Sequence, residues 1–120
     1  MMWPHELRIY VAVEPVDMRL SFDRLAGIVR ERLGHEPRTR PVLVVFHNRR
    51  RTHLKLLWHD KSGYCVLYKR LDRGTFRIPL PPTPGATSVK VGRREVALIL
   101  EGIDRELLRR ARRRMKERAA

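Results

Sequence analysis

The sequence contains a single cysteine, Cys65, and no apolar run long enough to cross a membrane. One cysteine cannot form a disulfide within the chain, which is typical of proteins in a reducing compartment. The first ten residues also contain no apolar core of the kind that a secretory signal requires. We therefore expect a protein that has no membrane partner and stays in the cytoplasm or on the nucleoid.

Acidic residues are scarce. The chain has 13 Asp and Glu against 27 Lys and Arg, which gives a net charge of +14 at pH 7. A small chain with this excess of positive charge usually meets a polyanion. The alternative is a basic surface that serves only solubility. The composition favours nucleic acid, or a partner that is itself bound to nucleic acid.

The few carboxylates argue against catalysis. Glu14 and Asp17 are close in sequence and could in principle hold Mg²⁺, but a two-metal site needs at least one more carboxylate. Asp60 and Asp72, the obvious candidates, lie in predicted turns. The sequence also has no glycine-rich phosphate loop and no nucleophile motif. We predict no enzyme activity, no catalytic residue and no cofactor.

The five histidines do not form a metal-binding set. His53 and His59 share a strand face but lie six residues apart, roughly 20 Å at the rise of a strand. His47 and His53 flank a turn that brings no carboxylate or second thiol to complete a zinc site. Cys65 falls on a predicted core face, where a thiol packs rather than reacts. We predict no metal site.

The centre of the chain predicts three antiparallel strands joined by two tight turns. Val42–His47 is apolar and β-branched, while Thr52–His59 and Tyr64–Arg70 alternate between apolar and polar residues. The breaks are Asn48–Arg51 and Asp60–Gly63, and the second carries the Asp and Gly that a type I turn prefers.

These turns set a register for the three strands. The first turn predicts two opposite pairs, Phe46 with His53 and Val44 with Lys55. The second predicts four, His59 with Tyr64, Leu57 with Val66, Lys55 with Tyr68 and His53 with Arg70. A slip by one residue would turn the charged side chains into the core, so the pattern of apolar residues fixes the faces.

The register divides the side chains between two faces. The predicted core face collects Leu43, Val45, Leu54, Leu56, Trp58, Cys65 and Leu67. The other face is basic, aromatic and partly apolar, and it collects Phe46, His53, Lys55, His59, Tyr64, Tyr68 and Arg70, with Val44, Leu57 and Val66 among them. We expect Leu54, Leu56 and Trp58 to be buried, and His53 and Lys55 to be exposed.

Two helical segments flank this unit. A strand over residues 7–13 precedes a helix over residues 22–33, which Ser21 caps and Gly34 ends. A second helical pattern starts at Arg93 and should bend near Gly102, with Asp104 as the candidate cap of its second piece.

Weaker signals lie between the third strand and the last helix. Thr75–Ile78 predicts a brief edge strand, and Val89–Val91 predicts a few more strand residues. The proline-rich stretch Pro79–Gly85 should be an extended connection.

Together these elements predict an α+β domain over residues 1–104 and a basic helical tail over residues 105–120. The domain should contain a small mixed or antiparallel sheet with the element order β-α-β-β-β. We expect the 22–33 helix and the C-terminal helix to pack on one face of that sheet.

Several segments resemble one protein family. They are Asp17-Met18-Arg19 with Ser21-Phe22-Asp23 and Leu25-Ala26, the sequence FHNRRR at 46–51 with LKLLW at 54–58, Gly63 with KRLDRGTF at 69–76, and LILEGID at 98–104. Their order and spacing resemble the TnpB-type, Orf2-like accessory proteins of bacterial insertion sequences of the IS66 class. The resemblance spans about residues 8–104.

This resemblance implies an accessory factor in DNA transposition, encoded beside a separate DDE-type transposase. No enzymatic activity is attributed to the family, whose members are presumed to act on DNA or on the transposase. The partners it implies are DNA, above all transposon ends, and the transposase subunit. A homodimer stays open.

The basic residues of the first turn, the mixed face and the tail are the candidates for nucleic-acid binding. They are Arg49, Arg50, Arg51, His53, Lys55, Arg70, Arg109, Arg110, Arg112, Arg113 and Arg114. Contacts of such residues with phosphates give affinity but little sequence specificity. Two alternatives remain. The mixed face could dock the transposase without DNA binding, or Tyr64 and Tyr68 could stack on RNA bases.

Overall fold

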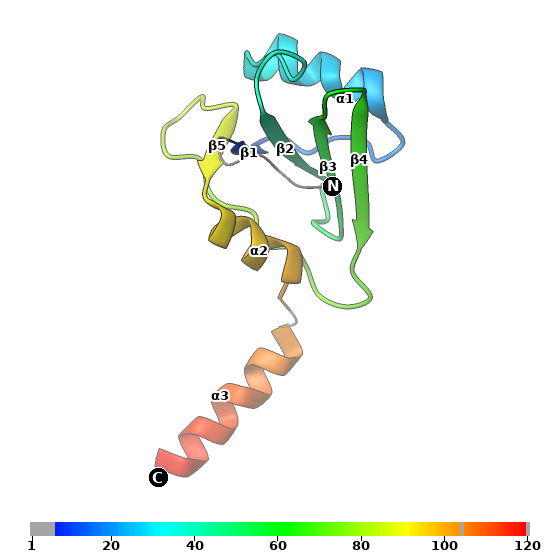
Figure 1. Ribbon diagram of the computed structural model, residues 1–120. Coiled ribbons are helices and arrows are strands. Elements are labelled where there is room, and N and C mark those ends of the chain that lie inside the picture. The colour runs from blue at the N-terminus through cyan, green and yellow to red at the C-terminus, as the bar shows by residue number, and fades with distance from the viewer. Residues whose placement is uncertain (1–6, 104, 120) are drawn as a thin grey trace.

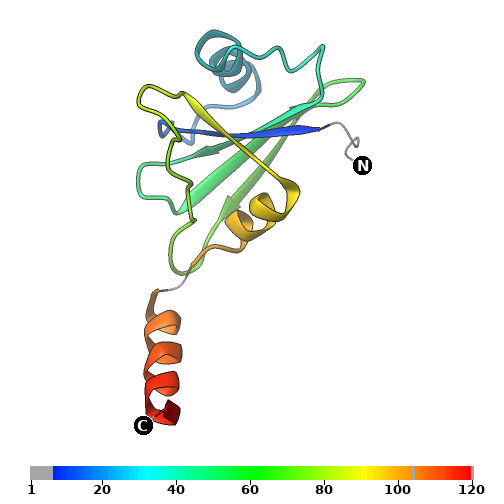
Figure 2. The same cartoon turned by 90° about the vertical axis from the view of Figure 1, so that its left-hand side faces the viewer.

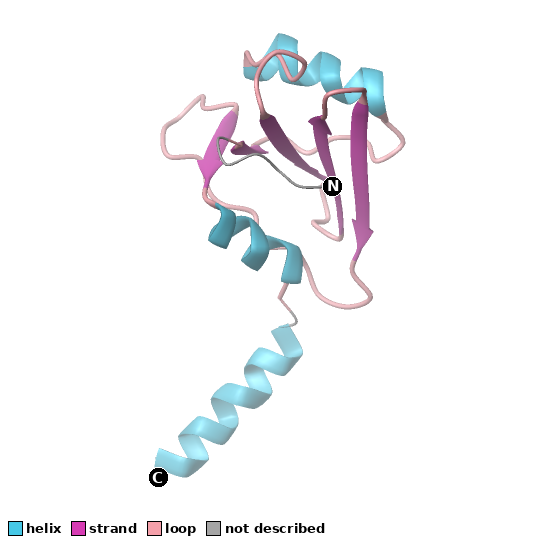
Figure 3. Ribbon diagram, in the orientation of Figure 1, coloured by secondary structure: helices cyan, strands magenta, loops and turns pink. Residues whose placement is uncertain are grey.

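The computed structural model describes residues 7–103 and 105–119, and its centre is a five-stranded sheet (Figures 1 and 3). The strands are β1 (Arg8–Ala12), β2 (Val42–His47), β3 (His53–His59), β4 (Tyr64–Arg70) and β5 (Ser88–Val91). Their order in the sheet is β4-β3-β2-β1-β5. β1 is parallel to β2, and every other neighbouring pair is antiparallel. The predicted α+β class with a mixed sheet is confirmed.

The helices follow the predicted boundaries closely. α1 (Phe22–Ile28) continues into a π-helical turn, η1 (Val29–Leu33), and the chain leaves it at Gly34 with a φ of 75°. α2 (Arg93–Glu101) and α3 (Arg105–Ala119) are separated near Gly102, as the interrupted pattern predicted. Ser21 has the extended backbone of an N-cap but makes no side-chain capping bond. The predicted cap Asp104 lies outside the described residues.

The helices cover opposite faces of the sheet, so the prediction that both pack on one face is wrong. Residues of α1 and η1 share a buried cluster with Val44, Phe46 and Leu57. Residues of α2 pack instead on Leu43 and Val45 from the other face. The physical reason is that β2 is buried at all six positions, which requires cover on both sides. The mixed face is therefore largely covered by α1 and is not a free surface.

The register of the second hairpin is confirmed, but that of the first is displaced by two residues. All four predicted pairs between β3 and β4 are present. Between β2 and β3, Phe46 lies opposite Lys55 and Val44 opposite Leu57, because the connecting turn is longer than predicted and extends through Thr52. A shift by two residues leaves every side chain on its predicted face, since the strand repeat is two.

The side chains of the predicted core face are less buried on β4 than on β3. Leu54 and Leu56 are fully buried as predicted, but Trp58 and Cys65 are only half-buried and Leu67 is 41% exposed. β4 is an edge strand, and the α2 side chains in the core cluster pack on β1, β2 and β3 residues. The sequence pattern identified the face correctly but could not show how far its cover reaches.

The segment after β4 contains less strand than predicted. Thr75–Ile78 forms only an isolated bridge between Thr75 and Ile103. Pro79–Gly85 contains neither helix nor strand, as its prolines predicted, and β5 occupies the place of the predicted Val89–Val91 strand. None of the helices in the described part of the chain combines the length and the hydrophobicity needed to span a lipid bilayer.

Lys55 is buried, which corrects the prediction that it is exposed. Its side chain lies under the loop before α1, and its residue is only 7% exposed. The Nζ atom donates a hydrogen bond to the Leu20 carbonyl at 2.7 Å and lies 4.7 Å from the centre of the Tyr68 ring. His53, predicted to be exposed, is half-buried. Alternation placed Lys55 on the right face, but only the tertiary fold puts a loop over that face.

Replacing Lys55 by Met should therefore lower the stability of the fold. The Lys55→Met change keeps the apolar stem but removes the donor to the Leu20 carbonyl, and a buried hydrogen bond from a charged group is worth about 1.5–3 kcal/mol. We expect a loss of that size in the free energy of unfolding measured with urea. The matched control is Lys90→Met on the exposed side of β5, which should stay within about 0.5 kcal/mol of wild type. Equal losses in the two variants would contradict the assigned role of Lys55.

Candidate nucleic-acid interface

The turn between β2 and β3 is organised by the side chain of Asn48. Its Oδ1 accepts hydrogen bonds from the backbone N–H groups of Thr52 at 2.9 Å and His53 at 3.0 Å. Its Nδ2 donates to the Thr52 hydroxyl at 2.9 Å. An asparagine that satisfies several groups of its own turn fixes the path of the backbone. The arginines that follow are therefore carried on a defined loop.

Arg49, Arg50 and Arg51 are all exposed on this turn. Arg51 has a φ of 60°, in the left-handed region that non-glycine residues seldom adopt. Its carbonyl accepts a 2.7 Å hydrogen bond from the Phe76 N–H, which helps to hold that conformation. We call residues 48–51 the arginine turn.

Main-chain hydrogen bonds bring the base of α3 to the same end of the molecule. The chain after β4 runs beside the arginine turn, with the Leu71 N–H donating to the Thr52 carbonyl at 3.1 Å. Thr75 and Ile103 then exchange two backbone hydrogen bonds, of 2.9 and 2.7 Å. Figure 1 shows the arginine turn and the start of α3 at the lower end of the sheet. The two basic segments, some fifty residues apart in sequence, thus begin near one another.

α3 carries the densest positive charge of the chain. Figures 1 and 2 both show it running away from the sheet. All five tail residues predicted to contact nucleic acid are exposed on it, namely Arg109, Arg110, Arg112, Arg113 and Arg114. Met115, between them and the end of the helix, is 70% exposed. At helical spacing the helix combines a broad basic surface with a narrower apolar stripe that contains Ala111 and Met115.

The remaining predicted contacts lie on the α1 face of β3 and β4. His53 and Arg70 are paired across the two strands next to the arginine turn. Arg70 is exposed, whereas the His53 ring lies 2.8 Å from the Thr52 hydroxyl through Nδ1 and packs against Tyr68. Lys55 does not belong to this surface, because its ammonium is occupied below the loop before α1.

Two further arginines belong to this end of the molecule and were not predicted. Arg73 is exposed in the segment that is bonded to the arginine turn. Arg19 is exposed in the loop before α1, whose Val16 N–H donates to the carbonyl of His47 at the end of β2. No periodic signal marks them. Both lie in segments that carried the family resemblance, Asp17-Met18-Arg19 and KRLDRGTF at 69–76, and these motifs are the signal that could have identified them.

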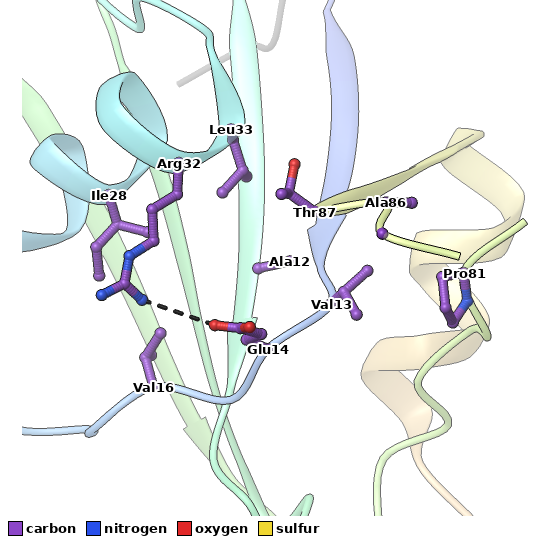
Figure 4. Close-up of a pocket in the computed structure, with 11 residues that line it drawn as sticks. Ala12, Val13, Glu14, Val16, Ile28, Arg32, Leu33, Pro81, Ala86 and Thr87 are labelled. Carbon is purple, nitrogen blue, oxygen red and sulfur yellow. Dashed lines mark ion pairs between the residues drawn. The ribbon is translucent and has the colours of Figure 1, made fainter. Parts of the chain in front are cut away.

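The pocket beside η1 does not have the features of a catalytic site. Figure 4 shows it between the end of β1, η1 and the loop before β5, with mostly apolar walls. Its acidic residue, Glu14, pairs with Arg32 at 3.8 Å across the opening. Asp17, the other carboxylate considered for Mg²⁺, pairs with Arg19 at 2.7 Å. Among the described residues, no three His, Cys, Asp or Glu side chains are grouped as a metal site would need.

Cys65 lies in a setting that disfavours the reactive thiolate. It is half-buried opposite Trp58, the predicted position, and its Sγ lies 3.6 Å from an Asp60 carboxylate oxygen. Burial, together with the negative charge of Asp60, raises the pKa of the Cys65 thiol. A raised thiol pKa is the opposite of what a nucleophilic cysteine requires.

A family model for IS66 Orf2-like proteins matches residues 7–110 of the chain. The chain belongs to the IS66 Orf2-like family. Two relatives from Sinorhizobium fredii are similar to it over 98 residues. The uncharacterized protein y4hO is 35% identical, with 82% of each chain covered, and the uncharacterized protein y4jC is 33% identical, with 82% of this chain and 80% of the relative covered. No solved structure matches the chain.

Membership in the IS66 Orf2-like family indicates an accessory role in transposition, and the family is not a known enzyme family. Residues of the motifs that carried the resemblance hold the backbone in place. Asp17 organises the loop before α1 by accepting the Arg19 N–H at 2.8 Å, and Asn48 builds the arginine turn. Gly102 allows the chain to pass Leu71 with a φ of 73° and a ψ of 177°.

Gly102 should be sensitive to substitution, in contrast to Gly27. An added Cβ at Gly102 would lie 2.7 Å from a methyl carbon of Leu71, and its backbone conformation is one that only glycine adopts readily. We expect Gly102→Ala to lower the free energy of unfolding by about 1–3 kcal/mol. Gly27 lies in α1 with open space around it, so Gly27→Ala should raise stability by about 0.5–1 kcal/mol. Thermal or urea unfolding of both variants tests the pair, and a neutral Gly102→Ala would refute it.

The Asp17–Arg19 pair predicts a measurable shift in acidity. Hydrogen bonds from the Arg19 side chain, followed by the Arg19 backbone N–H, lower the pKa of Asp17 from 3.8 to about 2. Arg19→Ala should raise the Asp17 pKa only part of the way back to 3.8, because the backbone N–H of residue 19 still donates to Asp17. NMR titration of the Asp17 carboxyl carbon measures this change. Because the folded pKa is the lower one, the stabilising contribution of the pair exists above pH 4 and disappears as the pH falls toward 2. The control is Asp60, whose pKa is lowered by Ser62 and Gly63 and should not move.

Proposed function

We propose that this IS66 Orf2-like protein is a non-catalytic accessory protein that binds DNA through its phosphates. The arginine turn and the basic face of α3 are the proposed contacts, with Arg70 and Arg73 beside them. Transposon ends are the proposed DNA partner, and the separate transposase of the element is the proposed protein partner. Contacts of this kind position a protein on DNA without reading its sequence.

The observation that carries the proposal is the convergence of charge at one end of the molecule. Backbone hydrogen bonds join Thr52, the segment 71–76 and Ile103, so the arginine turn and α3 leave the domain from the same end. Three adjacent arginines repel one another, and no carboxylate lies among them to compensate. Such an arrangement has a use when phosphates provide the counter-charge.

The composition of α3 supports the same proposal. The helix contains eight basic residues and only Glu106 and Glu117 as acids, so pairs within the helix can neutralise little of its charge. Its exposed arginines spread over most of the circumference and leave only the stripe with Ala111 and Met115 uncharged. A helix of this kind gains stability from an external polyanion, whereas in isolation its like charges oppose helix formation.

The alternatives have less support. Docking of the transposase on the mixed face would need Val44, Phe46 and Leu57 to be accessible, but all three are buried under α1. RNA stacking on both tyrosines would need free rings. The Tyr64 hydroxyl accepts bonds from Arg30 and Arg38, while Tyr68 is 53% exposed. Transposase docking at another surface is the competing proposal, and the experiment below separates it from DNA binding.

Neutralising the arginine turn should weaken DNA binding in a salt-dependent way. For the Arg49/Arg50/Arg51→Ala variant we expect the slope of log affinity against log salt concentration to fall by roughly 2–3, since each phosphate contact contributes about 0.9. The weakening should be similar on the transposon end and on random DNA. A second variant with Gln at Arg109, Arg110, Arg112, Arg113 and Arg114 should also reduce the slope. The measurement is DNA affinity by fluorescence anisotropy at several salt concentrations.

A matched variant controls for the loss of total charge. Arg24, Lys61 and Lys90 are exposed on other parts of the surface, so Arg24/Lys61/Lys90→Ala removes the same charge and should change the slope by less than about 1. If the turn, the tail and the control all leave the slope unchanged while transposition fails, the basic segments do not bind DNA. Docking of the transposase is then the better explanation.

A further inference from the structure

β4 has an unpaired edge whose free backbone groups can be assigned. In the described part of the chain it pairs with β3 on one side and with no strand on the other (Figure 3). Leu71 donates its N–H to Thr52 and Asp60 donates its N–H to Gly63, which fixes the hydrogen-bonded positions of this antiparallel pair. The alternate positions direct both N–H and C=O outward. In β4 these outward residues are Tyr64, Val66, Tyr68 and Arg70.

The edge has few of the features that keep natural edge strands from pairing, and its exposed charge is Arg70 at the end of the strand. β4 has seven residues with no proline among them, and its centre carries Leu67 and Tyr68, which are 41% and 53% exposed. The lysine of the strand, Lys69, does not guard the edge, because its Nζ is bonded to the Leu100 carbonyl of α2 at 2.6 Å. The opposite edge, β5, has only four residues and follows the proline-rich connection. A long, partly apolar edge with so little protection favours pairing with another strand.

We propose that a second copy of this chain pairs with β4 in an antiparallel manner, with Leu67 on the two-fold axis. Only the four outward residues can form the new backbone bonds, so they must pair with one another. The alignment that uses all four on each copy places Val66 opposite Tyr68 and Tyr64 opposite Arg70. The result is one continuous sheet across an isologous dimer.

The side chains are self-complementary in this alignment. Leu67 meets Leu67 of the second copy on one face, and Val66 meets Tyr68 on the other, so apolar groups lie together at the centre. The basic residues Lys69 and Arg70 lie opposite Cys65 and Tyr64. A parallel arrangement would instead place the basic ends of both strands side by side. An antiparallel arrangement centred on Lys69 would oppose two lysines, which is unfavourable.

Charge opposes the dimer and gives it a characteristic salt dependence. Each copy carries a net charge of +14, and Arg70 of the second copy would approach Tyr64, whose hydroxyl already accepts bonds from Arg30 and Arg38. Repulsion of this kind is screened within about 8–10 Å at moderate salt. Added salt should therefore strengthen the dimer, while the proposed DNA binding should weaken. The two proposals can fail independently.

Disulfide trapping tests the alignment. At the axis, the two Leu67 residues form a pair without backbone hydrogen bonds, about 4.5 Å apart between Cα atoms, which lies within the roughly 4.4–6.8 Å that disulfides span. Leu67→Cys in a Cys65→Ser background should give a reducible dimer of twice the 14.2 kDa chain under mild oxidation. Lys90→Cys in the same background, on β5, is the control and should stay monomeric. Wild-type Cys65 should not cross-link either, because it lies opposite Lys69.

Sedimentation equilibrium without DNA tests the backbone pairing. Tyr68→Pro removes an outward N–H while leaving the bonds to β3 intact, whereas Tyr68→Ala removes the same ring but keeps the N–H. We expect wild type to be dimeric, Tyr68→Ala to remain dimeric, and Tyr68→Pro to dissociate with a roughly tenfold or larger increase in Kd. Circular dichroism confirms that each variant is folded. A wild-type chain that stays monomeric from low to high salt, or equal cross-linking of Leu67→Cys and Lys90→Cys, would overturn the proposal.

Discussion

The burial of β2 on both faces is the constraint on which the rest of the structure depends. All six of its residues are buried, so the sheet needs a layer on each side, and α1 with η1 supplies one while α2 supplies the other. β1 beside it shares this environment, with Val11 and Ala12 buried on different faces. The sequence of a strand that is buried on both faces is a continuous run of apolar residues, as it is at residues 42–46. Exposed charges must then lie on the solvent side of the helices that cover the sheet, or beyond these helices.

The available places for charge are the outer faces of the covering helices, the turns, the edges and the tail. Lys55 is a buried charge, and its ammonium donates a hydrogen bond to a carbonyl of the loop that covers it. The arginines of the 48–51 turn are exposed charges. The Asn48 side chain and the hydrogen bond from the Phe76 N–H to the Arg51 carbonyl hold a loop that carries these arginines away from the core. α3 extends the same principle, as it runs away from the sheet and carries exposed arginines over most of its surface.

The motif residues of the IS66 Orf2-like family connect these parts. Asp17 holds the loop that Lys55 supports from below, Asn48 holds the arginine turn, and Gly102 lets α2 end against Leu71. Each acts on the backbone rather than on a substrate. The motifs therefore preserve the arrangement of the basic segments, and the segments themselves supply the charge. This division agrees with an accessory protein whose carboxylates, Glu14 and Asp17, are engaged by arginines.

Local patterns in the sequence determined the types of the elements, the faces of β3 and β4, the register of the second hairpin and the break at Gly102. The order of the motifs also identified the family. Periodicity, turn residues and motif order could do this because they are properties of residues that are close in the sequence. The tertiary structure decided what covers each face. The mixed face contains Val44, Phe46 and Leu57, and the sequence alone could not show whether it is exposed or covered. The same alternation of apolar and polar residues is compatible with an exposed face and with a face that a helix covers. The two-residue shift of the first hairpin accompanies a longer turn, which the Asn48 side chain holds by bonds to Thr52 and His53. The meeting of the arginine turn with the base of α3 depends on backbone bonds between residues far apart in the chain, which no local pattern encodes.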